Sequence, residues 1–411
     1  MRIALATSSF SPYVGGVEEH VRHVARVLAQ NGHDVVVWTI SRDGSRTVRE
    51  VDGIQVCDLP APLPARSVGD IARFAVRLPR ALFAWWRAAR SFRADVIHVH
   101  CFGPNGTYAR WVSRATRTPM VLTTHGETMA DDHGLFTHSR FARRSLRTSL
   151  QSAEAVTGCS QLVLDDLADR FGLAPGTGTV VFNGIDAEET PEEPVTGLPD
   201  RYVAAIGRLQ RVKGFDLLID AYAASAIAPD VGLVIGGDGP EADLLRRRAK
   251  EMGVAEHVVL PGRLSRGQVA TVLDGAAAVV VPSRFEAFGI TGLEAWRAGA
   301  PLVATARGGM REFVRDGVDG LIVDPESTAS LAAAITALVG DDDLARRMAR
   351  AGAERLPSFG WREVVEQYEA LYRETLGVPA PAPHAPDAAV PSQPPPSSMR
   401  TPGLGRDGEP Q

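Results

Sequence analysis

The sequence predicts an α/β protein built from two doubly wound domains that face each other across a cleft. Short apolar runs alternate with segments of helical periodicity along most of the chain, a pattern typical of parallel sheets with connecting helices. A length of 411 residues exceeds what one ordinary hydrophobic core supports, so two domains are expected. An acidic, proline-rich stretch at 188–200 interrupts the alternation near the middle and is interpreted as a linker.

Residues 1–187 form the first expected domain. A helical pattern at 17–28 lies between two apolar runs and completes a βαβ unit. The expected strands of this domain are 3–6, 35–40, 96–99, 120–123 and 179–182. Strands that are joined by helices in this way run parallel, and a parallel sheet is covered on both faces.

Residues 201–360 form the second expected domain, with helices rich in alanine, leucine and arginine between its strands. The expected strands are 202–206, 232–235, 258–260, 278–281 and 302–304. Ligands of such sheets bind outside the carboxyl ends of the strands, which places a site in the cleft. An amphipathic helix at 361–377 follows. The stretch 378–411 is so rich in proline, alanine and serine that we expect it to be disordered.

Composition and charge narrow the class of protein. Apolar residues make up 45% of the chain, as in globular proteins, and the net charge of -5 gives no reason to expect nucleic acid as a partner. Cys57, Cys101 and Cys159 are widely spaced, which argues against a disulfide framework or a metal cluster, so reduced thiols are expected. No segment has the apolar length of a signal peptide or a membrane span, and we expect a cytoplasmic protein.

Two glutamates, Glu286 and Glu294, are the most informative residues of the chain. Glu286 falls in the turn after an apolar run, whereas Glu294 lies inside the helix that follows. The start of that helix offers unpaired backbone N–H groups to a phosphate, and these belong to Phe288, Gly289 and Ile290. Carboxylates on either side suit sugar hydroxyls. Together these groups predict a pocket for a nucleotide sugar.

This spacing resembles the paired-glutamate signature of the family 4 retaining glycosyltransferases of the GT-B fold, in which two Rossmann-like domains face an interdomain cleft. The resemblance runs from residue 3 to about residue 376. It implies transfer of a sugar from a nucleotide-sugar donor to an acceptor with retention of anomeric configuration, with no metal ion and no cofactor. In that family the first glutamate contacts the transferred sugar and the second binds the ribose, and the matching positions are Glu286 and Glu294.

Other motif positions carry further expected roles. Arg208 and Lys213 follow a strand of the second domain, where a guanidinium and an ammonium group can hold a diphosphate and stabilise the leaving group. His125 ends a strand of the first domain, and the resemblance places it against the donor sugar. Gly15 and Gly16 form a glycine pair after the first strand, where the backbone can approach a phosphate or an acceptor closely.

Two glycine-rich segments receive different interpretations. The segment 236–241 lacks the third glycine of a dinucleotide fingerprint, which argues against a bound dinucleotide cofactor. The pair Gly308 and Gly309 resembles one that the family places near the nucleotide, with Glu312 three residues on.

Residues 66–93 contain seven arginines and one acidic residue, interleaved with tryptophan and phenylalanine. This composition suits the surface of an anionic membrane, so the segment is a candidate for peripheral contact with a membrane or with a lipid-linked or anionic acceptor. An ordinary amphipathic helix with a charged outer face is the alternative.

Two other functions stay open at this point. A nucleotide-sugar epimerase of the same fold would turn over the donor without an acceptor, and a scaffold would keep the fold without turnover. The presence of the complete set Glu286, Glu294, Arg208 and Lys213 favours an active transferase. Donor base, transferred sugar, acceptor, linkage and oligomeric state are left open by the sequence.

Overall fold

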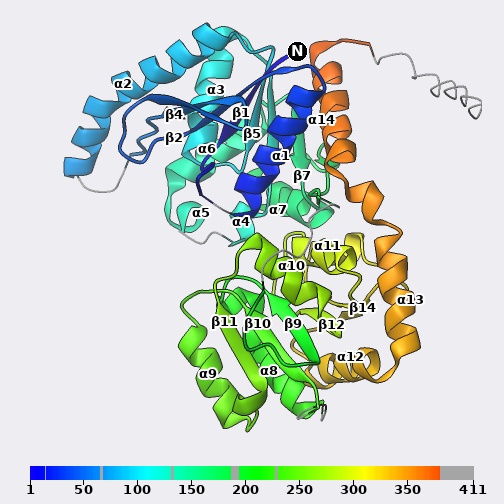
Figure 1. The fold of residues 1–411 in the computed structure, drawn as a ribbon. Coiled ribbons are helices and arrows are strands. Elements are labelled where there is room, and N and C mark those ends of the chain that lie inside the picture. The colour runs from blue at the N-terminus through cyan, green and yellow to red at the C-terminus, as the bar shows by residue number, and fades with distance from the viewer. Residues whose placement is uncertain are drawn as a thin grey trace, which may run out of the picture.

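The chain folds into two α/β halves that lie one above the other, each with its own central parallel sheet (Figure 1). The computed structural model describes residues 1–13, 15–64, 68–130, 134–186, 194–225, 227 and 230–379. Residues 188–193 of the expected linker and 380–411 of the expected disordered tail therefore lie outside the described residues. The two-domain GT-B architecture is confirmed by the two sheets.

The N-terminal sheet has eight strands in the order β3-β4-β2-β1-β5-β6-β7-β8. They are β1 Arg2–Thr7, β2 Asp34–Ile40, β3 Thr47–Val51, β4 Ile54–Leu59, β5 Val96–His100, β6 Met120–Thr124, β7 Ala155–Gly158 and β8 Thr179–Val180. Only the edge strand β3 is antiparallel to its neighbour. The five expected strands are confirmed, although the last is only two residues long, whereas β3, β4 and β7 were not predicted.

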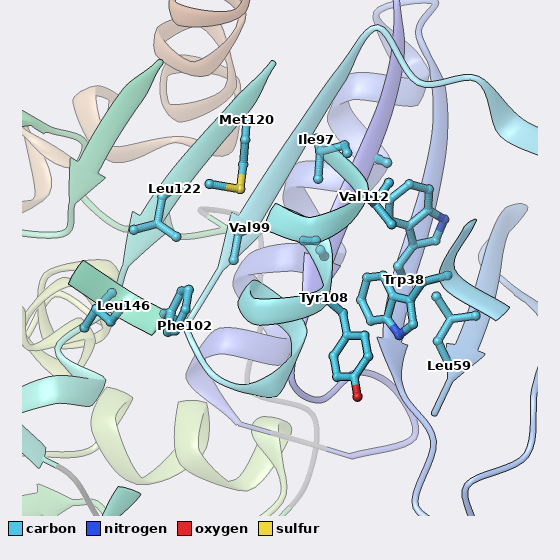
Figure 2. Packing of buried hydrophobic residues seen from close by; sticks show 14 of the residues in the cluster. Trp38, Leu59, Ile97, Val99, Phe102, Tyr108, Val112, Met120, Leu122 and Leu146 are labelled. Carbon is cyan, nitrogen blue, oxygen red and sulfur yellow. The ribbon is translucent and has the colours of Figure 1, made fainter. Parts of the chain in front are cut away.

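Helices cover both faces of this sheet. They are α1 Gly16–Gln30, α2 Val68–Phe92, α3 Pro104–Thr116, α4 Glu127–Ala130, α5 Leu135–His138, α6 Arg140–Leu150 and α7 Gln161–Phe171. One face packs against α2, α3, α6 and α7, and Figure 2 shows side chains of its buried core. Within that core the Trp85 ring of α2 stacks on Tyr108 of α3 at 5.6 Å and meets Trp38 of β2 edge-on at 6.0 Å. These contacts fix α2 against the side of the sheet that carries β2 and β4.

The C-terminal sheet has six parallel strands in the order β11-β10-β9-β12-β13-β14. They are β9 Tyr202–Ile206, β10 Gly232–Gly236, β11 Val258–Gly262, β12 Ala278–Val281, β13 Leu302–Thr305 and β14 Leu321–Val323. Its helices are α8 Phe215–Ala224, α9 Ala242–Glu251, α10 Arg266–Asp274, α11 Ile290–Arg297, α12 Thr328–Gly340 and α13 Asp342–Ala353. Four short 3-10 helices add to them: η1 Arg211–Lys213, η2 Ala255–His257, η3 Gly309–Glu312 and η4 Leu356–Phe359. All five expected strands are present, and β14 was missed.

The last described helix, α14 (Trp361–Leu376), returns to the N-terminal half and lies beside α1 (Figure 1). Tyr368 and Tyr372 are fully buried there, and the Tyr372 hydroxyl lies 2.6 Å from His98 Nδ1. Asn31 Nδ2 donates to Glu369 Oε1 at 2.7 Å. The helix thus completes the core on the second face of the N-terminal sheet. None of the described helices, not even the 25-residue α2, combines the length and apolar character needed to cross a bilayer.

Candidate active site

Glu286 and Lys213 meet at the carboxyl edge of the C-terminal sheet. Glu286 follows β12, and Lys213 ends the short helix η1 after β9. The Lys213 ammonium lies 2.7 Å from Glu286 Oε2, and the Ser283 hydroxyl donates to the same oxygen at 3.1 Å. Both partners of the ion pair are mostly buried, so the pair is less screened by solvent than a surface pair. Two residues that are 73 positions apart in the sequence are therefore held as one unit.

Arg284 holds the two loops that carry this pair. Its guanidinium donates to both Asp216 carboxylate oxygens at 2.7 Å, a bidentate geometry of high specificity. The Arg284 backbone N–H donates to the carbonyl of Val212 at 2.8 Å. Burial raises the pKa of the Asp216 carboxyl, but the Arg284 hydrogen bonds, the Arg284 charge and nearby backbone N–H donors together outweigh this effect and hold the pKa below its usual value. Sequence reasoning missed this positioning pair.

Two glycines allow the loops to pack this closely. Gly214 has φ +67°, and a Cβ there would collide with the carbonyl of Pro282. Gly289 has φ +97° and precedes α11, where a Cβ would lie 2.6 Å from Met310 Cγ and 3.2 Å from Glu286 Cγ. Both positions combine left-handed backbone with crowding, so any side chain would displace the site.

The expected helix is confirmed as α11, which begins at Ile290 with Gly289 as its N-cap, whereas phosphate binding at its start stays a prediction. Its start lies beside Glu286 and therefore beside Lys213. Phe288 is 2% exposed and packs on Phe313 at 4.8 Å, so only its backbone is available to a ligand. Glu294 is half-buried one turn into the helix. The positive end of a helix and an ammonium group thus converge on one place.

Arg208 lies two residues beyond β9 with an exposed side chain. The backbone after it is fixed because the N–H of Leu209 donates to the carbonyl of Asp238 at 2.9 Å. Gly237 and Gly239 permit this contact, since a Cβ on either would collide with the carbonyls of Gly207 or Leu209. The segment 236–241 therefore supports the Arg208 loop by packing against it.

His125 occupies the carboxyl end of β6 in the N-terminal half. Glu127 fixes its loop by accepting hydrogen bonds from the backbone N–H of His125 at 2.7 Å and of Phe102 at 2.6 Å. Burial raises the pKa of Glu127 above its usual value, while these N–H donors oppose that effect. The Glu127 carboxylate thus fixes the two loops that follow β5 and β6.

Four imidazoles gather behind this strand end and form the histidine cluster: His20, His98, His100 and His125. Burial lowers the pKa of His125 to about 4 and that of His98 to about 3, so both rings are neutral at neutral pH. Three of the rings, excluding His98, offer nitrogens within 4.8 Å of one another, a set that could hold a metal ion. Some of these nitrogens already have hydrogen-bond partners: His20 Nε2 lies within hydrogen-bond distance of the Tyr368 hydroxyl, and His100 Nδ1 within that distance of His125 Nε2. The expectation that sugar transfer needs no metal ion stays a prediction.

The two halves touch at the loops that carry His125 and Glu286. The Ser160 hydroxyl donates to the carbonyl of Ala287 at 2.7 Å. A Cβ on Gly126 would lie against the Ala287 side chain, so these two loops are in direct contact. The structure thereby brings the loop of the expected sugar-binding histidine into contact with the loop of the expected sugar-binding glutamate.

Glu312 forms a second contact between the halves that the sequence did not reveal. Its carboxylate accepts hydrogen bonds from the backbone N–H groups of Gln161 at 2.6 Å and Leu162 at 3.0 Å, in the first turn of α7. A negative charge at a helix N-terminus is stabilised by the helix dipole. The residue beside the Gly308 and Gly309 pair thus joins the C-terminal half to the N-terminal half.

Gly15 and Gly16 lie at the start of α1, on the N-terminal side of the cleft. A Cβ on Gly16 would meet nothing within 4 Å, so the backbone there borders open space. In the same helix Glu19 accepts a hydrogen bond at 2.6 Å from Arg266 of the C-terminal half. The glycine pair therefore borders the cleft between the halves.

Comparisons with known proteins agree with this geometry. Residues 14–189 match the model of Glycosyltransferase Family 4, and residues 186–355 match that of Glycosyl transferases group 1. The chain is 30% identical over 400 residues to a glycogen synthase of Mycobacterium tuberculosis, covering 90% of this chain and 94% of the relative. It is 31% identical over 395 residues to D-inositol 3-phosphate glycosyltransferase 1 of Catenulispora acidiphila, covering 88% and 91%.

Solved structures share the fold. Sucrose-phosphate synthase from Thermosynechococcus elongatus has a TM-score of 0.72 and 24% identity, covering 91% of this chain and 99% of that chain. HepE of Anabaena in complex with UDP and glucose has a TM-score of 0.71 and 20% identity, covering 91% of this chain and 100% of that chain. With two halves facing a cleft, a paired-glutamate motif at α11 and matches along nearly the whole chain, this protein belongs to the family 4 (group 1) glycosyltransferases of the GT-B fold and is a glycosyltransferase.

Proposed function

We propose that the protein transfers a sugar from a UDP-sugar to an acceptor with retention of anomeric configuration and without a metal ion. The observation that carries the proposal is the Lys213–Glu286 pair at the start of α11, in contact with the His125 loop through Ala287. UDP is favoured as the nucleotide because HepE, a structural neighbour, is described in complexes with UDP and with UDP-glucose.

The cationic groups take the role of a metal ion in this proposal. The diphosphate lies between Lys213, Arg208 and the first N–H groups of α11, which stabilise the charge that develops on it. The bond between the anomeric carbon and the phosphate oxygen breaks, and its electron pair stays with the phosphate. The acceptor hydroxyl forms the new bond on the same face of the sugar, and its proton passes to the departing phosphate oxygen.

The remaining groups orient the donor. Glu286 Oε2 is already bound by Lys213 and Ser283, which favours a role in holding sugar hydroxyls over a role as a covalent nucleophile. His125 holds the sugar from the opposite side of the cleft as a neutral imidazole, and Glu294 binds the ribose. Contact between the halves excludes water and limits hydrolysis of the donor.

The test is thermal shift with a panel of nucleoside diphosphates and UDP-glucose, on the wild type, Glu294→Ala and the matched control Glu354→Ala. Glu354 is an exposed carboxylate on the same half, paired with Arg350. We expect one nucleotide to stabilise the wild type and the control, and to stabilise Glu294→Ala less. No response to any nucleotide would refute the donor site.

Further arms test the reaction itself. Activity that persists with EDTA supports the metal-free mechanism, and NMR of the glycoside formed reports the anomeric outcome. Conversion of the donor sugar without any acceptor would point to the epimerase.

We also propose that the outer face of α2 contacts an anionic membrane. Its exposed apolar side chains include Val76, Phe83 and Trp86, at 76%, 59% and 42% exposure, with arginines between them. The test is cosedimentation with phosphatidylcholine vesicles with and without phosphatidylglycerol. We expect binding only to the anionic vesicles, reduced by Phe83→Ser and unchanged by Phe141→Ser, an equally apolar exposed position on α6.

A further inference from the structure

A cavity of about 780 Å³ lies in the N-terminal half between α2 and the loop that joins β2 to β3. Its lining is dominated by arginine. Two of these residues come from the loop and three from α2: Arg42, Arg46, Arg77, Arg80 and Arg87. We call this cavity the arginine pocket.

The arginine pocket carries a large uncompensated positive charge. Its lining has one carboxylate, Asp43, whose Oδ1 already accepts hydrogen bonds from the hydroxyls of Ser41 and Ser45 and from the Ser45 N–H. These bonds lower the pKa of Asp43 to about 2, so it contributes one negative charge against five positive ones. No ion pair joins the five guanidinium groups to a carboxylate in the described part of the chain. Like charges gathered around a concave surface attract anions strongly.

The arginine pocket adjoins the loop that follows β1. A smaller adjoining hollow of about 120 Å³ shares Ser41 and Arg42 with it and reaches Ser8 and Tyr13 in the loop after β1. The Arg42 guanidinium lies over the Tyr13 ring at 3.6 Å from its centroid, which ties the two hollows together. In the sequence, the loop after β1 is followed by the glycine pair at the start of α1.

Guanidinium groups are suited to phosphate because two N–H groups can bind two oxygens in one plane. Five of them in one cavity exceed what a single phosphate needs. Phe83 adds an exposed apolar ring to the same lining. The cavity therefore fits a molecule that has several phosphate groups and a less polar part.

We infer that the arginine pocket binds the phosphate groups of the acceptor, and that the acceptor carries at least two of them. The inference rests on the proposed transferase function, in which the acceptor enters from the N-terminal half. The phosphates belong either to a soluble molecule or to a lipid headgroup, and the chemistry of recognition is the same for both.

The experiment is isothermal titration calorimetry with inorganic tripolyphosphate as the probe. We expect Arg77→Ala and Arg80→Ala each to weaken binding by about tenfold, because each removes a charge-assisted contact. Arg90→Ala is the matched control, since Arg90 lies on the same helix outside the arginine pocket. Equal weakening by all three substitutions would show general attraction to a basic helix and would overturn the inference, as would the absence of binding to the wild type.

UDP binding, measured by thermal shift on the same variants, separates this inference from the proposed function. Unchanged UDP binding in Arg77→Ala with lost tripolyphosphate binding supports a separate acceptor site. UDP binding without any tripolyphosphate binding overturns the acceptor inference and leaves the donor proposal intact.

A second arm identifies the source of the phosphates. The protein is sedimented with phosphatidylcholine vesicles containing phosphatidylinositol bisphosphate, with and without tripolyphosphate. Capture that Arg80→Ala removes and tripolyphosphate competes away assigns the pocket to a lipid headgroup. Tripolyphosphate binding without such capture assigns it to a soluble acceptor.

Discussion

Glu312 allows a direct test of how the two halves of the molecule are held together. Its carboxylate accepts two backbone hydrogen bonds at the N-terminus of α7, and Glu312→Ala removes both. Hydrogen bonds to a charged group are strong when buried, but these two are solvent-exposed. Loss of both should therefore reduce the free energy that favours the closed arrangement by about 1–2 kcal/mol. That amount lowers the ratio of closed to open molecules by roughly 5- to 30-fold.

The assay combines small-angle scattering with UDP affinity. We expect Glu312→Ala to enlarge the radius of gyration and weaken UDP binding, because only the closed arrangement brings both halves to the donor. Glu312→Gln should fall between wild type and alanine, since its amide oxygen still accepts a hydrogen bond without the charge. Glu354→Ala serves as the control. If Glu312→Ala matches this control in both measurements, the contact does not determine closure and the reasoning is wrong.

Three further predictions concern charge, pH and packing. Lys213→Met should lower kcat by about 10²- to 10³-fold through loss of leaving-group stabilisation, with Lys250→Met, an exposed lysine on α9, unchanged in a donor-turnover assay. The pKa of His125 is about 4 in the folded protein against about 6.5 in the unfolded chain, so the unfolded chain binds more protons as pH falls below about 6.5. The free energy of unfolding should therefore decrease from about pH 6.5 to pH 4 in urea titrations, and a flat profile would contradict burial of the histidine cluster. Trp85→Ala should cost about 3–5 kcal/mol in the same titrations, whereas Trp86→Ala, one position along and exposed, should cost far less.

The strands that the sequence predicted are those with continuous apolar runs. Two of the missed strands lack such runs for physical reasons. β3 (Thr47–Val51) is an edge strand with exposed polar positions, and β7 (Ala155–Gly158) is four residues of mainly small side chains. The apolar run of β14, Leu321–Val323, was missed although it is as long as the predicted runs at 258–260 and 302–304.

The site was predictable where its residues share one segment and unpredictable where distant loops meet. Glu286 and the start of α11 lie a few positions apart, so spacing alone relates them. Arg284 and Asp216 are 68 residues apart, and Glu312 is 151 residues from its partner Gln161. Such pairs arise only when strand order brings loop ends together, and a single sequence does not encode that order in local patterns. The adjacency of Arg284 to Glu286 is the one signal that could have drawn attention to it.

The return of α14 has a consequence for the order in which the molecule is completed during synthesis. His98 and its partner Tyr372 are 274 residues apart, so the whole C-terminal half is made between them. Until α14 emerges from the ribosome, the face of the N-terminal sheet that it covers presents apolar and histidine side chains without their partners. The half that is synthesised first is therefore completed last. In its nascent form this face of the sheet stays uncovered for as long as translation of the C-terminal half takes.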